Sequence, residues 1–366
     1  MSSYRSDFGS ITLLAAGLGL CLAGCGSNDV PTGISGNDRP AAEVTAALPF
    51  GPFPGKTTIF VDVDNTSGLE DGSQSRPFNS IRDALAVAKN GDVVGVAPGV
   101  YAETFPQGGP NYVIDGLKNF ALLGSGPKRT TIRGDHSFSL IRVQNGASAI
   151  IRGFTIEHGG QIRHSEGGGI QVLGRLDSVT LTVSNVILRD NEAVNGAAIE
   201  ADGRASLQLF NVLIARNRSS NCCSVLLRGE KVYASFKHTT ITQNAASFHA
   251  GGVVVEARSR LDLVNSIVWG NTLADAVTSD GARLIAAFSD VGGVLLPGRG
   301  NLSVDPRFVD PGNHDFRLRL NSPAVDAGNN VRGVSTDLFG HPRPVDGDGD
   351  GVAVIDMGAF ERLAKP

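Results

Sequence analysis

Aspartates at regular spacing near the end of the chain have the pattern of a calcium-binding loop. They occupy positions 1, 3 and 5, a glycine stands at position 6, and another aspartate stands at position 11. Calcium prefers oxygen ligands, and carboxylates this close repel one another unless a cation joins them. The competing interpretation is a glycine-rich turn held by side-chain-to-backbone hydrogen bonds. The predicted calcium ligands are Asp346, Asp348, Asp350, the backbone carbonyl of Val352, and Asp356.

Polar residues at matching positions of successive repeats form a second candidate site. If the repeats stack, Asp190 lies beside Arg216, and Glu157 lies within reach of Arg189, as cross-strand ion pairs. An insertion at residues 161–166 lengthens the preceding repeat and places a loop beside this polar face. A solvated polar face is the default alternative. The candidate ligand-binding residues are His158, His164, Arg189, Asp190 and Arg216.

The cysteines bear on export and on a disulfide, which an exported protein permits. Cys222 and Cys223 are adjacent, and Cα atoms about 3.8 Å apart make a disulfide between them strained. Cys25 ends the segment Leu-Ala-Gly-Cys, which follows an apolar run too short to span a bilayer. This segment resembles a bacterial lipobox, with Cys25 as the lipidated residue. An ordinary signal peptide cleaved nearby is the alternative, and Gly26 resembles the sorting position of outer-membrane lipoproteins.

A repeat must position the polar residues of the central region. Four segments bounded by polar residues, at 185–191, 211–217, 238–244 and 265–271, begin 26, 27 and 27 residues apart. A fixed period of this length is typical of a solenoid in which each repeat adds one coil. Two further short apolar runs accompany each segment. The pattern predicts an all-β, right-handed parallel β-helix with three short strands per coil and roughly nine coils.

The repeat also assigns inward and corner positions. The positions one and three places after the leading polar residue and two places before it are mostly apolar, so these columns are predicted to face the core. The trailing column, Asn191, Asn217, Asn244 and Asn271, is predicted to form a ladder of stacked amides at a turn. We expect the left-handed backbone conformation, which asparagine tolerates, in this trailing column.

The two ends of the solenoid need covers, because exposed strand edges invite further strand addition. Residues 81–88 follow helical spacing after a possible N-cap at Asn79 or Ser80, and this helix is predicted to cover the first coil. Residues 26–55 lack periodicity and read as a flexible tether. The net charge of −4 gives no basic surface for nucleic acid.

Particular segments carry a family resemblance. Residues 61–73, 77–81 and 91–101 resemble the opening of β-helix proteins of the pectin lyase-like superfamily, which includes pectate lyases, polygalacturonases and alginate epimerases. The aspartate cluster and the Gly-His-Gly and Arg-x-Lys motifs of polygalacturonases are missing, as is the alginate-epimerase pattern. Residues 285–363 resemble the choice-of-anchor Q module, which we expect to cap the far end of the rod.

These observations define the sequence-based hypothesis. We expect a lipoprotein signal peptide at 1–24, a tether at 25–55, a β-helix at 56–285 and a C-terminal capping module at 286–366. The predicted role is a lipid-anchored binding or structural protein of a Gram-negative cell surface, with structural calcium. Its expected partners are the membrane, through the lipid, and polysaccharide or envelope components. The alternative is a lyase or epimerase acting on acidic polysaccharide.

Overall fold

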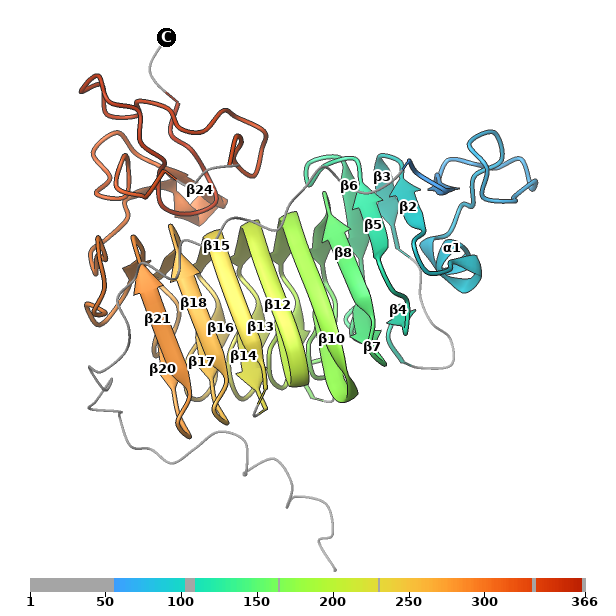
Figure 1. Cartoon of the computed structure of the whole chain (residues 1–366), viewed down its shortest axis with the longest axis horizontal. Helices are drawn as coiled ribbons and strands as arrows, with labels where there is room; N and C mark the ends of the chain where they lie inside the picture. Colours follow the sequence, from blue (N-terminus) through green and yellow to red (C-terminus); the bar gives the residue numbers. More distant parts are fainter. Residues whose placement is uncertain (1–55, 103–108, 164, 230, 331–333, 364–366) are drawn as a thin grey trace, which may run out of the picture.

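The protein is a rod of stacked coils with a smaller module beside one end, as the computed structural model shows (Figure 1). The structure describes residues 56–102, 109–163, 165–229, 231–330 and 334–363. Every strand pairing within the coils is parallel, and consecutive coils pair strand on strand. The predicted all-β, right-handed parallel β-helix is confirmed. The predicted signal peptide and tether, including Cys25, lie outside the described residues.

Three parallel sheets form the walls of the rod, and the long strands β10, β12 and β15 turn corners to join two or three of them. The first sheet contains β1 (Ile59–Val61), β2 (Val93–Val96), β5 (Phe120–Gly124), β8 (Ser148–Arg152), β10 (Ile170–Arg189), β12 (Ile199–Ala215), β15 (Tyr233–Thr242), β18 (Arg260–Val264) and β21 (Arg283–Ala287). The second contains β4 (Tyr112–Asp115), β7 (Ile141–Gln144), β10, β12, β14 (Val225–Arg228), β17 (Val253–Val255) and β20 (Ala276–Thr278). The third contains β3 (Gly99–Tyr101), β6 (Thr130–Arg133), β9 (Thr155–Glu157), β10, β12, β15, β19 (Ile267–Trp269) and β22 (Asp290–Val291).

The described strands place nine levels in the first sheet and seven in the second, so seven turns contain all three walls. A short ladder of β11 (Glu192–Ala193), β13 (Arg218–Ser219) and β16 (Ala245–Ala246) runs along one corner. The predicted inward columns all lie in the core. For example, Leu188, Ile214, Ile241 and Val268 stack in register and are inaccessible to solvent. Aliphatic stacking along the axis is the solenoid's form of a hydrophobic core.

The trailing asparagines form the predicted ladder. Asn191 donates from its backbone N–H and its Nδ2 to Asn217 Oδ1, at 3.1 and 2.9 Å. Asn217 makes the same pair of bonds to Asn244, and Asn244 makes them to Asn271. Asp275 ends the series by accepting both donors of Asn271. Because these side chains are largely buried, the ladder satisfies amides that would otherwise be costly.

The left-handed backbone conformation lies elsewhere than predicted. It occurs in the leading column, at Asn185, Asn211, His238 and Asn265, with φ near 50°. It also occurs one residue before the trailing asparagines, as at Asp190 and Arg216. The chain bends at these places, whereas the trailing asparagines keep ordinary φ so that their amides point along the axis.

Helix α1 (Ile81–Val87) covers the N-terminal end of the rod (Figure 1). Ser80 is its N-cap and accepts a hydrogen bond from the backbone N–H of Asp83, at 3.2 Å. Ile81 and Ala84 are fully buried in the solenoid core, which confirms the predicted helix and its covering role. None of the helices in the described part of the chain has the length and apolarity to traverse a bilayer.

The opposite end is closed by residues 292–302 rather than by the whole C-terminal module. Leu296 inserts into the core cluster, and Phe288 donates to Arg299 O at 2.8 Å. Leu302 and Val291 continue this backbone pairing. The predicted boundary at 285/286 falls inside β21, so the solenoid instead ends with β22 at Val291.

The rest of the module packs against the outer face of the third sheet, which corrects the prediction of an end cap. Its hairpin consists of β23 (Phe308–Asp310), a 3-10 turn η2 (Pro311–Asn313) and β24 (Asp315–Leu318). Phe308 and Phe316 share an apolar cluster with Leu213 and Ile267 of the solenoid. Leu213 and Ile267 are apolar residues on the outer face of the sheet, where a solvated surface would not need them. Their burial against the module explains where the module lies.

The leading polar column connects the module to four successive coils. Asn185 donates to Asp337 O at 3.3 Å, and Asn211 donates to Thr336 O at 2.9 Å. His238 contacts the guanidinium of Arg343 at 3.0 Å. Asn265 exchanges two hydrogen bonds with the backbone of Asn329, at 2.9 and 2.8 Å. The first column of the repeat is thus an attachment row for the module.

Candidate functional site

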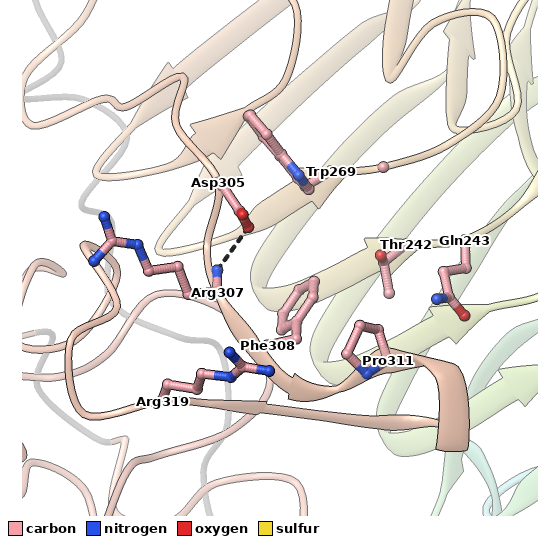
Figure 2. Close-up of a pocket in the computed structure, with 9 residues that line it drawn as sticks. Thr242, Gln243, Trp269, Asp305, Arg307, Phe308, Pro311 and Arg319 are labelled. Atoms are coloured by element: carbon pink, nitrogen blue, oxygen red, sulfur yellow. Dashed lines mark hydrogen bonds between the residues drawn. The ribbon is translucent and has the colours of Figure 1, made fainter.

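A pocket of about 320 Å³ opens between the third sheet and the hairpin of the module, and we call it the Trp269 pocket. Thr242 and Trp269 come from adjacent levels of the sheet and lie in register. Phe308 and Arg319 come from the module (Figure 2). The volume lies at the lower end of the range for small-molecule sites, about 300–1,000 Å³. It suits a single ring-sized group.

Strand alternation places the indole of Trp269 outside the core. Val268 before it points inward and is fully buried, so the neighbouring side chain faces the module. Trp269 is half-buried, and it is the only tryptophan in the chain. Gln243 adds an exposed amide beside it, and Figure 2 shows Phe308 and Pro311 on the module side. The pocket therefore combines an aromatic surface with polar groups that can orient a ligand.

The charges at the Trp269 pocket are two arginines and one aspartate. Arg319 Nη2 donates to Val309 O at 2.8 Å, and Arg307 Nη1 donates to Asn321 O at 2.7 Å. Neither guanidinium has an ion-pair partner among the described residues. Asp305 instead accepts the backbone N–H of Arg307 at 2.8 Å. Figure 2 shows Arg319 turned toward Phe308 and Pro311, whereas the Arg307 guanidinium points away.

A second pocket, of about 190 Å³, contains two of the predicted ligand residues, Arg189 and Arg216. Arg189 pairs with Glu157 at 2.6 Å, and Arg216 pairs with Asp190 at 2.8 Å, as the repeat predicts. These arginines are consequently neutralised. The pocket is also smaller than typical ligand sites. The structure thus brings Arg189, Asp190 and Arg216 together as an ion-pair row rather than as an open anion site.

Glu157 is the centre of that row. Its carboxylate is almost inaccessible and lies between Arg133, at 2.7 Å, and Arg189, at 2.6 Å. Burial acts to raise the pKa of Glu157, but the hydrogen bonds and charges of the two arginines outweigh it and lower the pKa. Glu157 is therefore ionised and fully occupied.

Of the two predicted histidines, His158 is the one that the structure describes, and it reaches neither pocket. His158 follows β9, and its ring centroid lies 5.0 Å from that of His136. Neither pocket lining includes His158. His164 lies outside the described residues, so its predicted role stays a prediction.

The aspartate loop gathers a different set of carboxylates from the predicted one. Oxygen atoms of Asp326, Asp346 and Asp348 lie within 4.8 Å of one another, the one such group found among the described residues. Asp326 accepts the backbone N–H groups of Gly347 and Asp348, both at 2.9 Å, so the loop folds back onto it. Three carboxylates suit a hard cation such as calcium. Sequence reasoning missed Asp326 because it lies outside the loop.

The other predicted ligands are not part of that group. Val352 is exposed, and Asp350 accepts the backbone N–H of Val352 at 2.8 Å in a local turn. Asp356 is fully buried and accepts the N–H groups of Asp326 and Arg362, at 2.8 and 2.6 Å. Burial raises the pKa of Asp356 to about 7. Asp356 thus fixes the module's backbone, and its role as a calcium ligand stays a prediction.

Two carboxyl groups beside the second sheet, the buried Glu200 and the half-buried Glu166, were also missed by sequence reasoning. Glu200 is inaccessible and binds Arg228 Nη2 at 2.5 Å and Gln171 Nε2 at 2.8 Å. Glu166 accepts from Asn195 Nδ2 at 3.0 Å, and its Oε2 is buried with no partner among the described atoms. Burial, and then the charge of Glu200, raise the pKa of Glu166 to about 7. The only sequence signal was its place at the end of the 161–166 insertion.

The chain is similar to one protein family of unknown function and, more weakly, to solved structures of a pectate lyase and of pectin methylesterases. The model of a family described as "Protein of unknown function (DUF1565)" matches residues 65–293, more than half of the chain. No curated protein matches the sequence. Among solved structures, pectate lyase Pel9A aligns at 13% identity with a TM-score of 0.46, covering 84% of this chain and 97% of its own.

Two pectin methylesterase structures align less well. Pectin methylesterase PemA from Erwinia chrysanthemi has 12% identity and a TM-score of 0.35, covering 68% of this chain and 94% of its own. A pectin methylesterase in complex with hexasaccharide VII has 12% identity and a TM-score of 0.32, covering 72% and 99%. No residue role is transferred from similarities this low.

Proposed function

The chain belongs to the DUF1565 family, and we propose that it binds an acidic polysaccharide through the Trp269 pocket. The observation that supports this proposal is the presence of Trp269 and an un-neutralised Arg319 in one ring-sized pocket. An indole offers a flat apolar face to a sugar ring. A guanidinium binds a carboxylate through two parallel hydrogen bonds. A uronic acid residue presents both groups.

Binding is favoured over catalysis by the residues around the pocket. Asp305 is the one carboxylate that lines it among the described residues. Glycoside hydrolysis ordinarily requires two carboxyl groups on opposite sides of the bond. In the ion-pair row, Arg189 pairs with Glu157 and Arg216 pairs with Asp190. None of these four side chains is therefore free to act as a base. A lyase or epimerase activity remains the alternative function, and the test below includes it.

The proposal includes a location for the protein. We infer that Cys25 carries a lipid, that residues 26–55 act as a tether, and that the rod stands on the outer membrane of a Gram-negative cell. The resemblance of residues 22–25 to a lipobox supports this inference. Incorporation of a fatty-acid label into the wild-type chain, but not into Cys25→Ser, is the expected result. Equal labelling would contradict it.

The binding test compares acidic and neutral oligosaccharides by titration calorimetry. We expect oligogalacturonate to bind and a neutral oligosaccharide of equal length to bind more weakly. Arg319→Gln should weaken acidic-ligand binding roughly tenfold or more, since a hydrogen bond to a charged group contributes about 1.5–3 kcal/mol. Trp269→Ala should weaken binding of both ligands.

Two exposed residues serve as controls for this test. Arg204→Gln removes an arginine at the corner between the second and first sheets, and Phe248→Ala removes an exposed aromatic ring outside the pocket. Both should bind like the wild type. Absence of binding to every acidic oligosaccharide tried would refute the proposal. Ultraviolet absorption from unsaturated products would instead support the lyase alternative.

A further inference from the structure

The corner before β14 differs from the corresponding corners of the neighbouring coils. Ile199, Val225 and Val253 stack in register, which aligns the two residues that precede each by three and two places. Ala197 donates to Cys223 O at 3.0 Å, and this bond confirms the alignment. The aligned pairs are Gly196–Ala197, Cys222–Cys223 and Ala250–Gly251. Two sulfur-bearing side chains thus stand between coils that carry only hydrogen or methyl groups there.

The small neighbours leave space in which the two thiols meet. Both cysteines are inaccessible and belong to an apolar cluster with Leu226, Ala250 and Val254. Their Sγ atoms lie 3.1 Å apart, about 1 Å more than the length of a disulfide bond. Cys222 is held in place by its backbone, because its N–H donates to Asn195 Oδ1 at 3.2 Å. The sequence alone disfavours this pairing because of strain, whereas the structure shows the sulfur atoms already facing each other.

We propose that Cys222 and Cys223 form a vicinal disulfide, which is a covalent modification of this corner. A small-molecule disulfide is the oxidant. The thiolate of one cysteine attacks it, a mixed disulfide forms, and one small thiol leaves. The thiolate of the second cysteine then attacks the sulfur of the first and releases the second small thiol. Both cysteine protons and both electrons are accounted for by the two thiols formed.

The geometry also determines the character of the bond. Adjacent Cα atoms are about 3.8 Å apart, below the usual range of 4.4–6.8 Å for disulfides, so the bond is strained and easily reduced. It closes no loop of chain, and it therefore adds little stability through the unfolded state. The other two cysteines, Cys21 and Cys25, precede the described residues, so Cys222 and Cys223 are the two cysteines of the described body.

Trypsin makes the test direct, because cleavage after Arg218 and Arg228 releases one peptide that contains both cysteines. The full chain is refolded with oxidised and reduced glutathione, denatured in excess alkylating reagent and digested without reductant. We expect peptide 219–228 to carry no alkyl group and to be two hydrogen atoms lighter than the dithiol. Treatment with dithiothreitol before alkylation should convert it to the doubly alkylated form.

Matched single variants complete the experiment. Cys222→Ser and Cys223→Ser should each give a peptide with one alkyl group, or with one glutathione attached. A doubly alkylated wild-type peptide after glutathione treatment would overturn the proposal. Linkage of this peptide to another cysteine, or a disulfide-linked dimer on a non-reducing gel, would also overturn it.

Discussion

Trp269 and Arg319 reach the same pocket from two parts of the chain, one on a solenoid strand and one after the module's hairpin. Whether an arginine can bind an anion depends on whether a carboxylate already pairs with it. The repeat also places Arg189 and Arg216 on the outer face of the coils. A carboxylate neutralises each of these two arginines. At the scale of single residues, the absence of an ion-pair partner distinguishes Arg319 from them among the described residues.

Glu166 gives a prediction of pH dependence. Its pKa is about 7 in the folded protein and near 4.5 when unfolded, so the folded state binds more protons between these values. Its contribution to stability is complete below about pH 4.5 and is lost as the pH rises to about 7. Glu166→Gln should therefore unfold at a higher temperature than the wild type at pH 8, with the difference shrinking toward pH 5.

Thermal melts at several pH values check this prediction. Asp177→Asn, which removes an exposed negative charge, is the control for the change in net charge. A difference between Glu166→Gln and the wild type that is the same at pH 5 and pH 8 would count against a raised pKa.

The carboxylates around Asp326 give a second residue-scale prediction. If calcium joins Asp326, Asp346 and Asp348, calcium should raise the melting temperature of the wild type, and chelation should reverse the change. Asp326→Asn should abolish the calcium-dependent increase. Asp350→Asn is the matched control and should retain it, because Asp350 lies outside the group. An increase that is lost in Asp350→Asn but kept in Asp326→Asn would instead favour the ligand set expected from the sequence.

At the scale of elements, the asparagine ladder links successive coils through a continuous series of hydrogen bonds. Asn217 Nδ2 donates to Leu188 O and Asn244 Oδ1, at 3.0 and 2.9 Å, while Oδ1 accepts both donors of Asn191. Removing the Asn217 side chain leaves several buried polar groups without a hydrogen-bond partner, and each such group costs about 1–3 kcal/mol.

Asn217→Ala should accordingly lower the free energy of unfolding by about 3 kcal/mol or more, as measured in urea. Asn313→Ala, whose side chain bonds an exposed aspartate on the hairpin, should change it by less than about 0.5 kcal/mol. Equal effects of the two substitutions would show that the ladder adds no stability beyond an exposed hydrogen bond.

At the scale of the whole molecule, Arg343 joins the module to the rod. It is buried, lies 3.4 Å from Glu361 Oε2, and contacts His238 of the solenoid at 3.0 Å. Burial is the main cause that lowers the pKa of His238, and the nearby charge of Arg343 adds to it, so this imidazole is neutral and can accept a hydrogen bond.

Arg343→Met should cost about 3–5 kcal/mol, since it leaves one partner of a buried pair. Limited proteolysis should then cut the module before the coils. The control is Arg317→Met, which breaks an exposed pair with Asp315 and should cost at most about 1 kcal/mol. Cleavage of the module and the coils at the same rate would show that the module does not detach from the rod before the rod unfolds.

The sequence by itself determined what repeats. The period, the inward columns, the asparagine stack and the ion pairs of Glu157 and Asp190 all follow from coil placed on coil, since each coil contacts mainly its neighbours. Tertiary structure decided what does not repeat. It put the module on the third sheet, Asp326 beside the aspartate loop, and Trp269 opposite Arg319. Such contacts join segments far apart in the chain, and no periodicity within either segment encodes them.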